Sequence, residues 1–152
     1  MFDRILSIFT GAPSQTELPP ADARTALGAL MVRAAKADRA YLFEEVEQID
    51  AVLAQLYDLN PVEAAKMRAQ CELLEKAMPE TEDLAGVLHD AIDVADREAA
   101  VRALWVIVFA DGVEHEEEDE LLHAVEAILG VSPADAKRLH DEEMAKRPVK
   151  QS

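Results

Sequence analysis

Two acidic segments carry carboxylates at a spacing suited to binding a cation. In each segment an Asp in a predicted turn precedes, by seven residues, a Glu near the start of a predicted helix. A second Glu stands directly before the first. Carboxylate oxygens are the ligands that Ca²⁺ and Mg²⁺ prefer, whereas Zn²⁺ favours nitrogen and sulfur. The pattern therefore predicts a divalent-cation site for Ca²⁺ or Mg²⁺ rather than Zn²⁺. The six candidate ligands are Asp38, Glu45, Asp111 and Glu118, with Glu44 or Glu117 assisting.

Helical periodicity directs one carboxylate of each segment toward the interior. At about 100° per residue, Glu118 points within roughly 20° of the middle of the apolar stripe of its helix, and Glu45 within roughly 40°. A carboxylate that leaves water is costly unless it is paired, hydrogen-bonded or bound to a metal. The acids around Glu117 need no ligand, because the positive end of the helix dipole favours acids in a first turn. Glu45 and Glu118 are thus the two positions that require an explanation.

Two alternatives to a metal remain open for these inward carboxylates. Each Glu can accept backbone N–H bonds from the opposing turn or pair with an arginine, which would make its role structural. The arginines considered for this role are Arg24, Arg33 and Arg97. Each Glu can also receive a basic group from a peptide or protein ligand. The sequence by itself does not distinguish among these three roles: a metal ligand, a structural acceptor within the fold, or an acceptor for a basic group of a partner.

Other motifs in the chain favour binding over catalysis. The string from Asp111 to Glu118 matches the second half of an EF-hand loop, but the positions before Asp111 are apolar, so an EF-hand is excluded. His115, Asp119 and His123 follow one row of a predicted helix, and that row diverges from the apolar stripe. This divergence predicts a solvent-facing polar surface. Because no nucleophile or ordered acid–base pair is evident, we expect neither an enzyme nor an organic cofactor.

Helices must position these side chains, because nearly all of the chain after residue 20 has helical spacing and no stretch alternates as a strand does. Capping residues followed by proline mark two helix starts, at Asn60-Pro61 and Ser132-Pro133. We predict seven helices near residues 21–37, 42–57, 61–78, 81–92, 94–110, 114–129 and 133–146. The expected fold is all-α, a compact bundle of about seven helices. A short amphipathic helix precedes it at residues 2–10.

The chain also contains an internal repeat. Residues 37–61 can be laid on residues 110–133 with a single one-residue gap near Tyr57. This alignment matches Glu45 with Glu118 and Val52 with Val125. The sequence therefore predicts two similar helical units around a pseudo-two-fold axis, with the 81–92 helix as a connector. The expected organisation is an amphipathic helix and linker at 1–20, a helical domain at 21–147 and a tail at 148–152.

Composition narrows the classes of partner. The 152 residues include 31 acids against 15 Lys and Arg, a net charge of −16, while half of them are hydrophobic. Such a chain can form a core but is poorly suited to nucleic acid or an anionic membrane surface. A protein with a basic surface is the expected partner, and a monomer or weak dimer the expected state. A single cysteine, Cys71, and the lack of a visible secretory signal favour the cytoplasm.

The residues of the second half resemble a known family. Segment 104–112 (LWVIVFADG), the acids up to Glu118, Leu121-Leu122 and segment 128–132 (ILGVS) are similar to TerB-like proteins. These bacterial proteins are related to the tellurite-resistance protein TerB and to the N-terminal domain of a membrane-anchored DnaJ-type co-chaperone. The resemblance covers roughly residues 21–146, although Arg39 stands where the family has Gly. It implies an all-helical two-repeat domain whose acidic cluster binds metal cations, and a role in tellurite or general stress.

Overall fold

The computed structural model describes residues 22–37, 43–110 and 115–146. Within these ranges the chain forms seven α-helices and one 3-10 helix and contains no strand. The α-helices are α2 (Ala23–Lys36), α3 (Phe43–Tyr57), α4 (Pro61–Ala77), α5 (Thr81–Ala91), α6 (Arg97–Val108), α7 (Glu116–Leu129) and α8 (Pro133–Ala145). The 3-10 helix η2 (Val94–Asp96) precedes α6. The predicted all-α bundle is confirmed, with helix ends within three residues of those expected. The predicted N-terminal helix and the tail lie outside the described residues.

Local capping explains where several helices begin and end. The Asn60 side chain accepts the backbone N–H of Glu63 at 2.8 Å, and the Glu63 carboxylate accepts the N–H of Asn60 at 2.9 Å. Ser132 caps α8 by accepting the N–H of Asp135 at 3.1 Å. Gly130 ends α7 with φ +80°, a backbone angle that favours glycine. At the acidic junction before α6, neither Asp93 nor Asp96 forms a side-chain cap.

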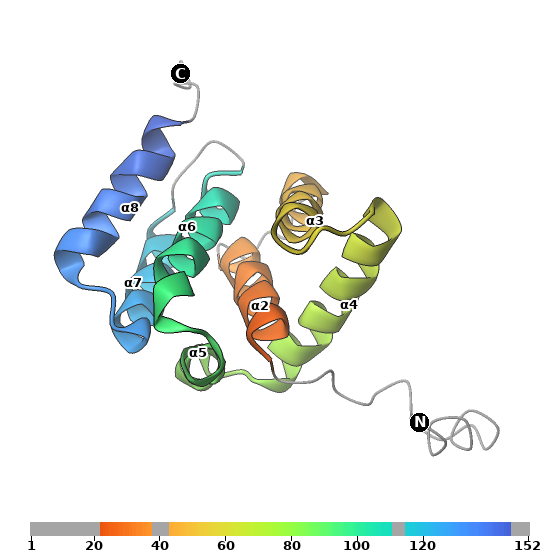
Figure 1. Ribbon diagram of the computed structural model, residues 1–152, viewed down its shortest axis with the longest axis horizontal. Coiled ribbons are helices and arrows are strands. Elements are labelled where there is room, and N and C mark those ends of the chain that lie inside the picture. Colours follow the sequence, from red (N-terminus) through yellow and green to blue (C-terminus); the bar gives the residue numbers. More distant parts are fainter. Residues whose placement is uncertain (1–21, 38–42, 111–114, 147–152) are drawn as a thin grey trace.

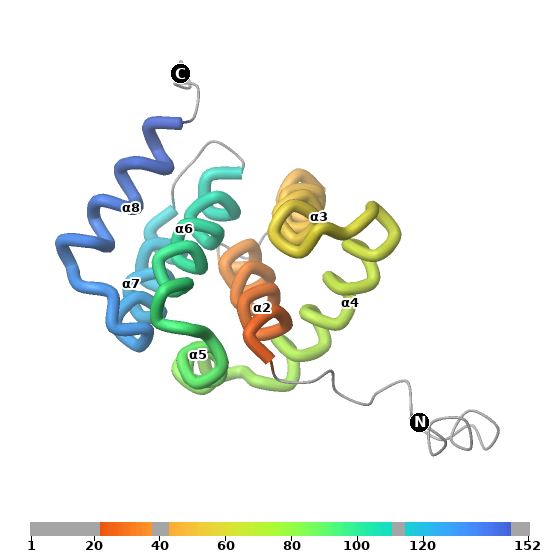
Figure 2. Tube along the Cα trace, in the orientation of Figure 1, coloured from red at the N-terminus to blue at the C-terminus, as the bar shows by residue number. Residues whose placement is uncertain are grey.

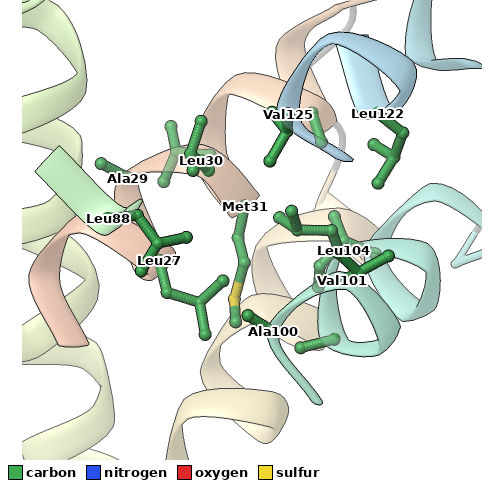
Figure 3. Close-up of a cluster of buried hydrophobic side chains, with 14 of the residues drawn as sticks. Leu27, Ala29, Leu30, Met31, Leu88, Ala100, Val101, Leu104, Leu122 and Val125 are labelled. Carbon is green, nitrogen blue, oxygen red and sulfur yellow. The ribbon is translucent and has the colours of Figure 1, made fainter. Parts of the chain in front are cut away.

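Helix α2 lies at the centre of the bundle and contacts α3, α4, α5, α6 and α7 (Figure 1). Its sequence is apolar on nearly every face, so most of its residues are buried. Figure 3 shows its side chains, among them Leu30 and Met31, facing Leu88 of α5, Leu104 of α6 and Val125 of α7. The helix predicted as a connector, α5, is part of this core, because it packs on both α2 and α7 and buries Leu84 and Leu88.

The two halves follow the same order of helices. A core helix, a helix that begins with acids and a helix that begins with proline occur as α2, α3 and α4, and again as α6, α7 and α8. Figure 2 shows the two proline-started helices, α4 and α8, at opposite sides of the bundle. Their packing differs, since α4 packs against both α2 and α3, whereas α8 packs mainly against α6. The repeat is therefore visible in the fold, but its second half is more open.

Candidate functional site

The two inward carboxylates occupy the same position in equivalent helices. Glu45 is the third residue of α3, and Glu118 is the third residue of α7. Their exposed fractions are 1% and 0%. The predicted inward orientation is therefore confirmed for both side chains. Burial of two carboxylates at one repeated position is unusual, because acids are almost never fully buried without a compensating interaction.

Part of the cost of burying the Glu118 carboxylate is offset by groups close to it in the chain. Its Oε1 accepts a hydrogen bond of 3.2 Å from the backbone N–H of His115, which precedes the helix. The first turn of α7 holds four acids, where the positive end of the helix dipole stabilises negative charge. The bond resembles the reciprocal half of a capping box. This backbone donor belongs to the residue that directly precedes Glu118's own helix.

The three arginines that the sequence offered as partners have other neighbours. Arg33 donates to the Glu75 carboxylate at 3.1 Å and to backbone carbonyls at the end of α4. The Arg24 guanidinium lies over the Tyr57 ring, 4.3 Å from its centroid. Arg97 lies beside Gly130, with its Nη1 3.5 Å from the place where a Cβ of that residue would stand. The contacts of Arg33 and Arg24 hold α2 against α4 and α3.

The remaining candidate ligands divide into two groups. Glu44 and Glu117 are exposed, each directly before its buried Glu. Glu117 lines a hollow of about 500 Å³, where α5 and α7 begin beside the end of α2. The acids of this hollow include Glu80, Glu82 and Glu120, and Lys36 also lines it. Asp38 and Asp111 lie outside the described residues. The structure therefore brings Glu117 next to other acids but does not describe the two turn aspartates.

Two further buried carboxylates were not predicted. Glu126 of α7 and Glu143 of α8 are as buried as the core around them. Glu143 is paired with Arg102 at 3.1 Å and Lys146 at 2.7 Å. These two cations hold its pKa below the usual range although burial opposes them. Helical spacing contained a signal for Glu126, since it lies four residues after Leu122 and three before Leu129 on the buried face.

The chemistry of the repeated site fits a hard divalent cation. All six candidate donors are carboxylates, which suit Ca²⁺ and Mg²⁺. Among residues 22–37, 43–110 and 115–146, no group of three or more His, Cys, Asp or Glu side chains is arranged to hold a metal ion. This finding covers the row of His115, Asp119 and His123, which forms no such group. It does not include the two turn aspartates.

Comparison with known families identifies the chain. The profile described as tellurite resistance protein TerB matches residues 24–141, from the start of α2 into α8. This chain belongs to the TerB family. The resemblance inferred from segments 104–112 and 128–132 is thereby confirmed. No curated protein and no solved structure matches the chain significantly. In the described part of this TerB-family domain, no helix is long and apolar enough to cross a membrane.

Proposed function

We propose that this TerB-family domain binds a divalent cation, Ca²⁺ or Mg²⁺, through the acidic positions that its two repeats share. The observation that carries the proposal is the burial of Glu45 and Glu118 at the same position of α3 and α7. The His115 N–H satisfies one oxygen of Glu118, and an apolar residue at either position would avoid the cost of burying a carboxylate. Retention of both acids is the expected consequence of a shared ligand.

Each repeat supplies ligands of the same kind. Glu45 and Glu118 would donate carboxylate oxygens from the first turns of α3 and α7, with Asp38 and Asp111 donating from the turns before them. The exposed Glu44 and Glu117 assist at the solvent side. A net charge of −16 raises the local concentration of cations around the domain. The bound cation would neutralise carboxylates whose burial is otherwise costly.

Calorimetric titration with Ca²⁺, Mg²⁺, Mn²⁺ and Zn²⁺ tests this function. We expect saturable heat with Ca²⁺ or Mg²⁺ in the wild type and its loss in the Asp111→Asn/Glu118→Gln double variant. The matched control is the Glu116→Gln/Glu120→Gln double variant, which also removes two negative charges, from exposed positions of α7. Wild-type protein without saturable heat, or a double variant that binds as the wild type does, would contradict the metal site.

The second candidate function is an acidic docking module that needs no metal. The hollow at the starts of α5 and α7 favours it, because its lining contains five acids against two cations, Arg33 and Lys36. The acids are Glu75, Glu80, Glu82, Glu117 and Glu120. A basic segment of a partner protein would complement this charge. The decisive measurement is binding of a lysine-rich peptide at two salt concentrations, with and without chelator. Binding that weakens at high salt and is unaffected by chelator supports docking. Binding that requires Ca²⁺ or Mg²⁺ supports the metal site instead.

In the cell we propose a non-enzymatic role in tellurite or general stress, in the cytoplasm. The family description supports the stress role, and the buried unpaired thiol of Cys71 suits a reducing compartment. Deletion of the gene followed by complementation tests the role. We expect the wild-type gene to restore growth on tellurite and the Asp111→Asn/Glu118→Gln variant to fail. Equal growth of the deletion strain and its parent on tellurite would confine the role to other stresses.

A further inference from the structure

A second concave site lies in the C-terminal half, away from the repeated acids. Helices α6, α7 and α8 enclose a groove of about 840 Å³, which lies within the size range of small-molecule sites. Apolar residues such as Val131 and Pro133 form much of its wall. Trp105, His123, Glu126 and His140 also line it, together with Lys137 and Asp141, which pair with each other at 2.7 Å. This groove, called the Trp105 groove below, combines an apolar wall with a few converging polar groups.

The polar groups of the Trp105 groove are organised around one buried carboxylate. Glu126 is 3% exposed and Trp105 is 1% exposed, and the indole Nε1 donates to Glu126 Oε2 at 3.2 Å. The His140 ring meets the Trp105 ring edge-on, with centroids 4.7 Å apart. Among the described residues, no Lys or Arg lies within ion-pair distance of Glu126. Within the described residues the carboxylate is thus held in place by a neutral donor and is not paired with a Lys or Arg.

The first repeat shows that the fold does not require this polar pair. By the alignment that matches Glu45 with Glu118, Glu126 corresponds to Leu53 and Trp105 corresponds to Val32. Leu53 and Val32 are both fully buried in the core. The same pair of positions is therefore apolar in one half and a carboxylate with an indole in the other. Because an apolar pair is the less costly choice, the polar pair indicates a role beyond stability.

The two repeats also differ in how closely their helices approach, and this difference explains why the groove exists. Gly28 of α2 packs directly against Cys71 of α4, which brings those helices close together. The corresponding residues in α6 and α8 are Val101 and Glu143, which are both larger. Helix α8 consequently packs mainly on α6 and leaves a groove along α7. In the first repeat, α4 covers α3, which is the counterpart of α7. The opening and the buried carboxylate thus occur in the same half of the molecule.

We propose that the Trp105 groove binds a small organic cation, namely a protonated amine attached to an apolar body about the size of an aromatic ring. The ammonium would be received by Glu126 beside the His140 ring, and the apolar body by the wall around Val131 and Pro133. A metal ion is not the expected occupant, because Glu126, His123 and His140 do not form a metal-holding group in the described structure. This site is independent of the proposed cation site at Glu45 and Glu118.

Fluorescence of Trp105 provides the test, because it is the only tryptophan in the chain. Phenethylamine serves as the probe, phenethyl alcohol as its neutral counterpart and hydrocinnamate as its anionic counterpart, all titrated near neutral pH with chelator present. We expect saturable binding of the amine at least about tenfold tighter than that of the alcohol, the scale of one charged hydrogen bond, and no binding of the anion. Chelator keeps this result separate from any metal bound elsewhere.

Two variants decide whether Glu126 is responsible. Glu126→Gln keeps an acceptor for the indole but removes the charge, so we expect equal affinities for the amine and the alcohol. Glu126→Leu restores the residue found at Leu53 and should fold normally by circular dichroism while losing the amine preference. Glu116→Gln, at an exposed position of α7, should bind as the wild type does. No saturable signal in the wild type, or an undiminished amine preference in folded Glu126→Gln, would overturn the proposal.

Discussion

The backbone of Gly28 in α2 lies directly against the thiol of Cys71 in α4. A Cβ at Gly28 would overlap the Cys71 Sγ, and Cys71 is fully buried. The absence of a side chain at one residue therefore sets how closely two helices approach. This contact holds the N-terminal repeat together along the central helix of the bundle, and the corresponding pair in the second repeat does not reproduce it.

Gly28→Ala is expected to destabilise the domain. Overpacking at a rigid contact typically costs about 1–3 kcal/mol of unfolding free energy, more than the helix propensity gained from alanine. Urea denaturation measures the change. The control is Gly86→Ala in α5, where the added Cβ meets nothing within 4 Å, so a gain of about 0.5–1 kcal/mol is expected. If Cys71→Ala does not lessen the cost of Gly28→Ala, the overlap is not its cause.

Cys71 is expected to be inert in the folded protein. Burial raises the pKa of its thiol to about 12, and the nearby charges of Asp22 and Glu72 act in the same direction. Since the thiolate is the reactive form, labelling by a thiol reagent near pH 8 should be at least about a hundredfold slower than in urea-unfolded protein. The reaction is followed by the absorbance of the thiol that the reagent releases when it reacts. Rapid stoichiometric labelling of the native protein would show that the site is open.

Arg33 is expected to be the most sensitive charged residue of the N-terminal half. Its guanidinium donates to the Glu75 carboxylate at 3.1 Å, to the carbonyls of Glu75 and Met78, and to Thr81 Oγ1 at 3.4 Å. It therefore fixes α2 to the connection between α4 and α5. Arg33→Met should cost about 3 kcal/mol of unfolding free energy, because it leaves a largely buried acid and carbonyls without their donor.

The control for Arg33 is an exposed ion pair. Lys137 lies 2.7 Å from Asp141 one turn away, and its side chain is 77% exposed. Lys137→Met is expected to change the unfolding free energy by less than about 0.5 kcal/mol. Urea denaturation of both variants at one ionic strength gives the comparison. Similar costs for the two substitutions would mean that the several acceptors of Arg33 add nothing beyond a surface pair.

Glu126 makes stability depend on pH. Burial raises its pKa in the folded state, against the lowering effects of the Trp105 hydrogen bond and of His123 and His140. A raised pKa means that the ionised form destabilises the fold above that pKa, and that this penalty is lost as the pH falls through it. Glu126→Gln should therefore be more stable than the wild type near neutral pH, by about 1 kcal/mol.

The same comparison at lower pH provides the check. Once the wild-type carboxyl is protonated in the folded protein, both side chains are neutral, so the difference between Glu126→Gln and the wild type should shrink toward zero as the pH approaches the unfolded-state pKa. Thermal or urea unfolding of both proteins across the acidic range measures it. A difference that is constant with pH would assign the effect to packing instead of ionisation.

Local features of the sequence predicted most of the fold. Caps such as Asn60 and Ser132 and the prolines after them act within one turn of chain, so helix starts are encoded where they occur. The inward direction of Glu45 and Glu118 followed from the helical period and the repeat. Family membership followed from segments whose residues are contiguous. Each of these properties depends on neighbours within a few residues.

Tertiary packing alone decided which side chains meet across the bundle. Arg33 was a candidate partner for the repeated acids, yet its acceptors lie on Glu75, Met78 and Thr81, more than forty residues away. The Trp105–Glu126 pair depends on how α6 packs on α7, and the groove beside it depends on how far α8 stands from α7. That distance is set by the bulk of residues on α6 and α8 together, and helical spacing within a single helix contains no information about it.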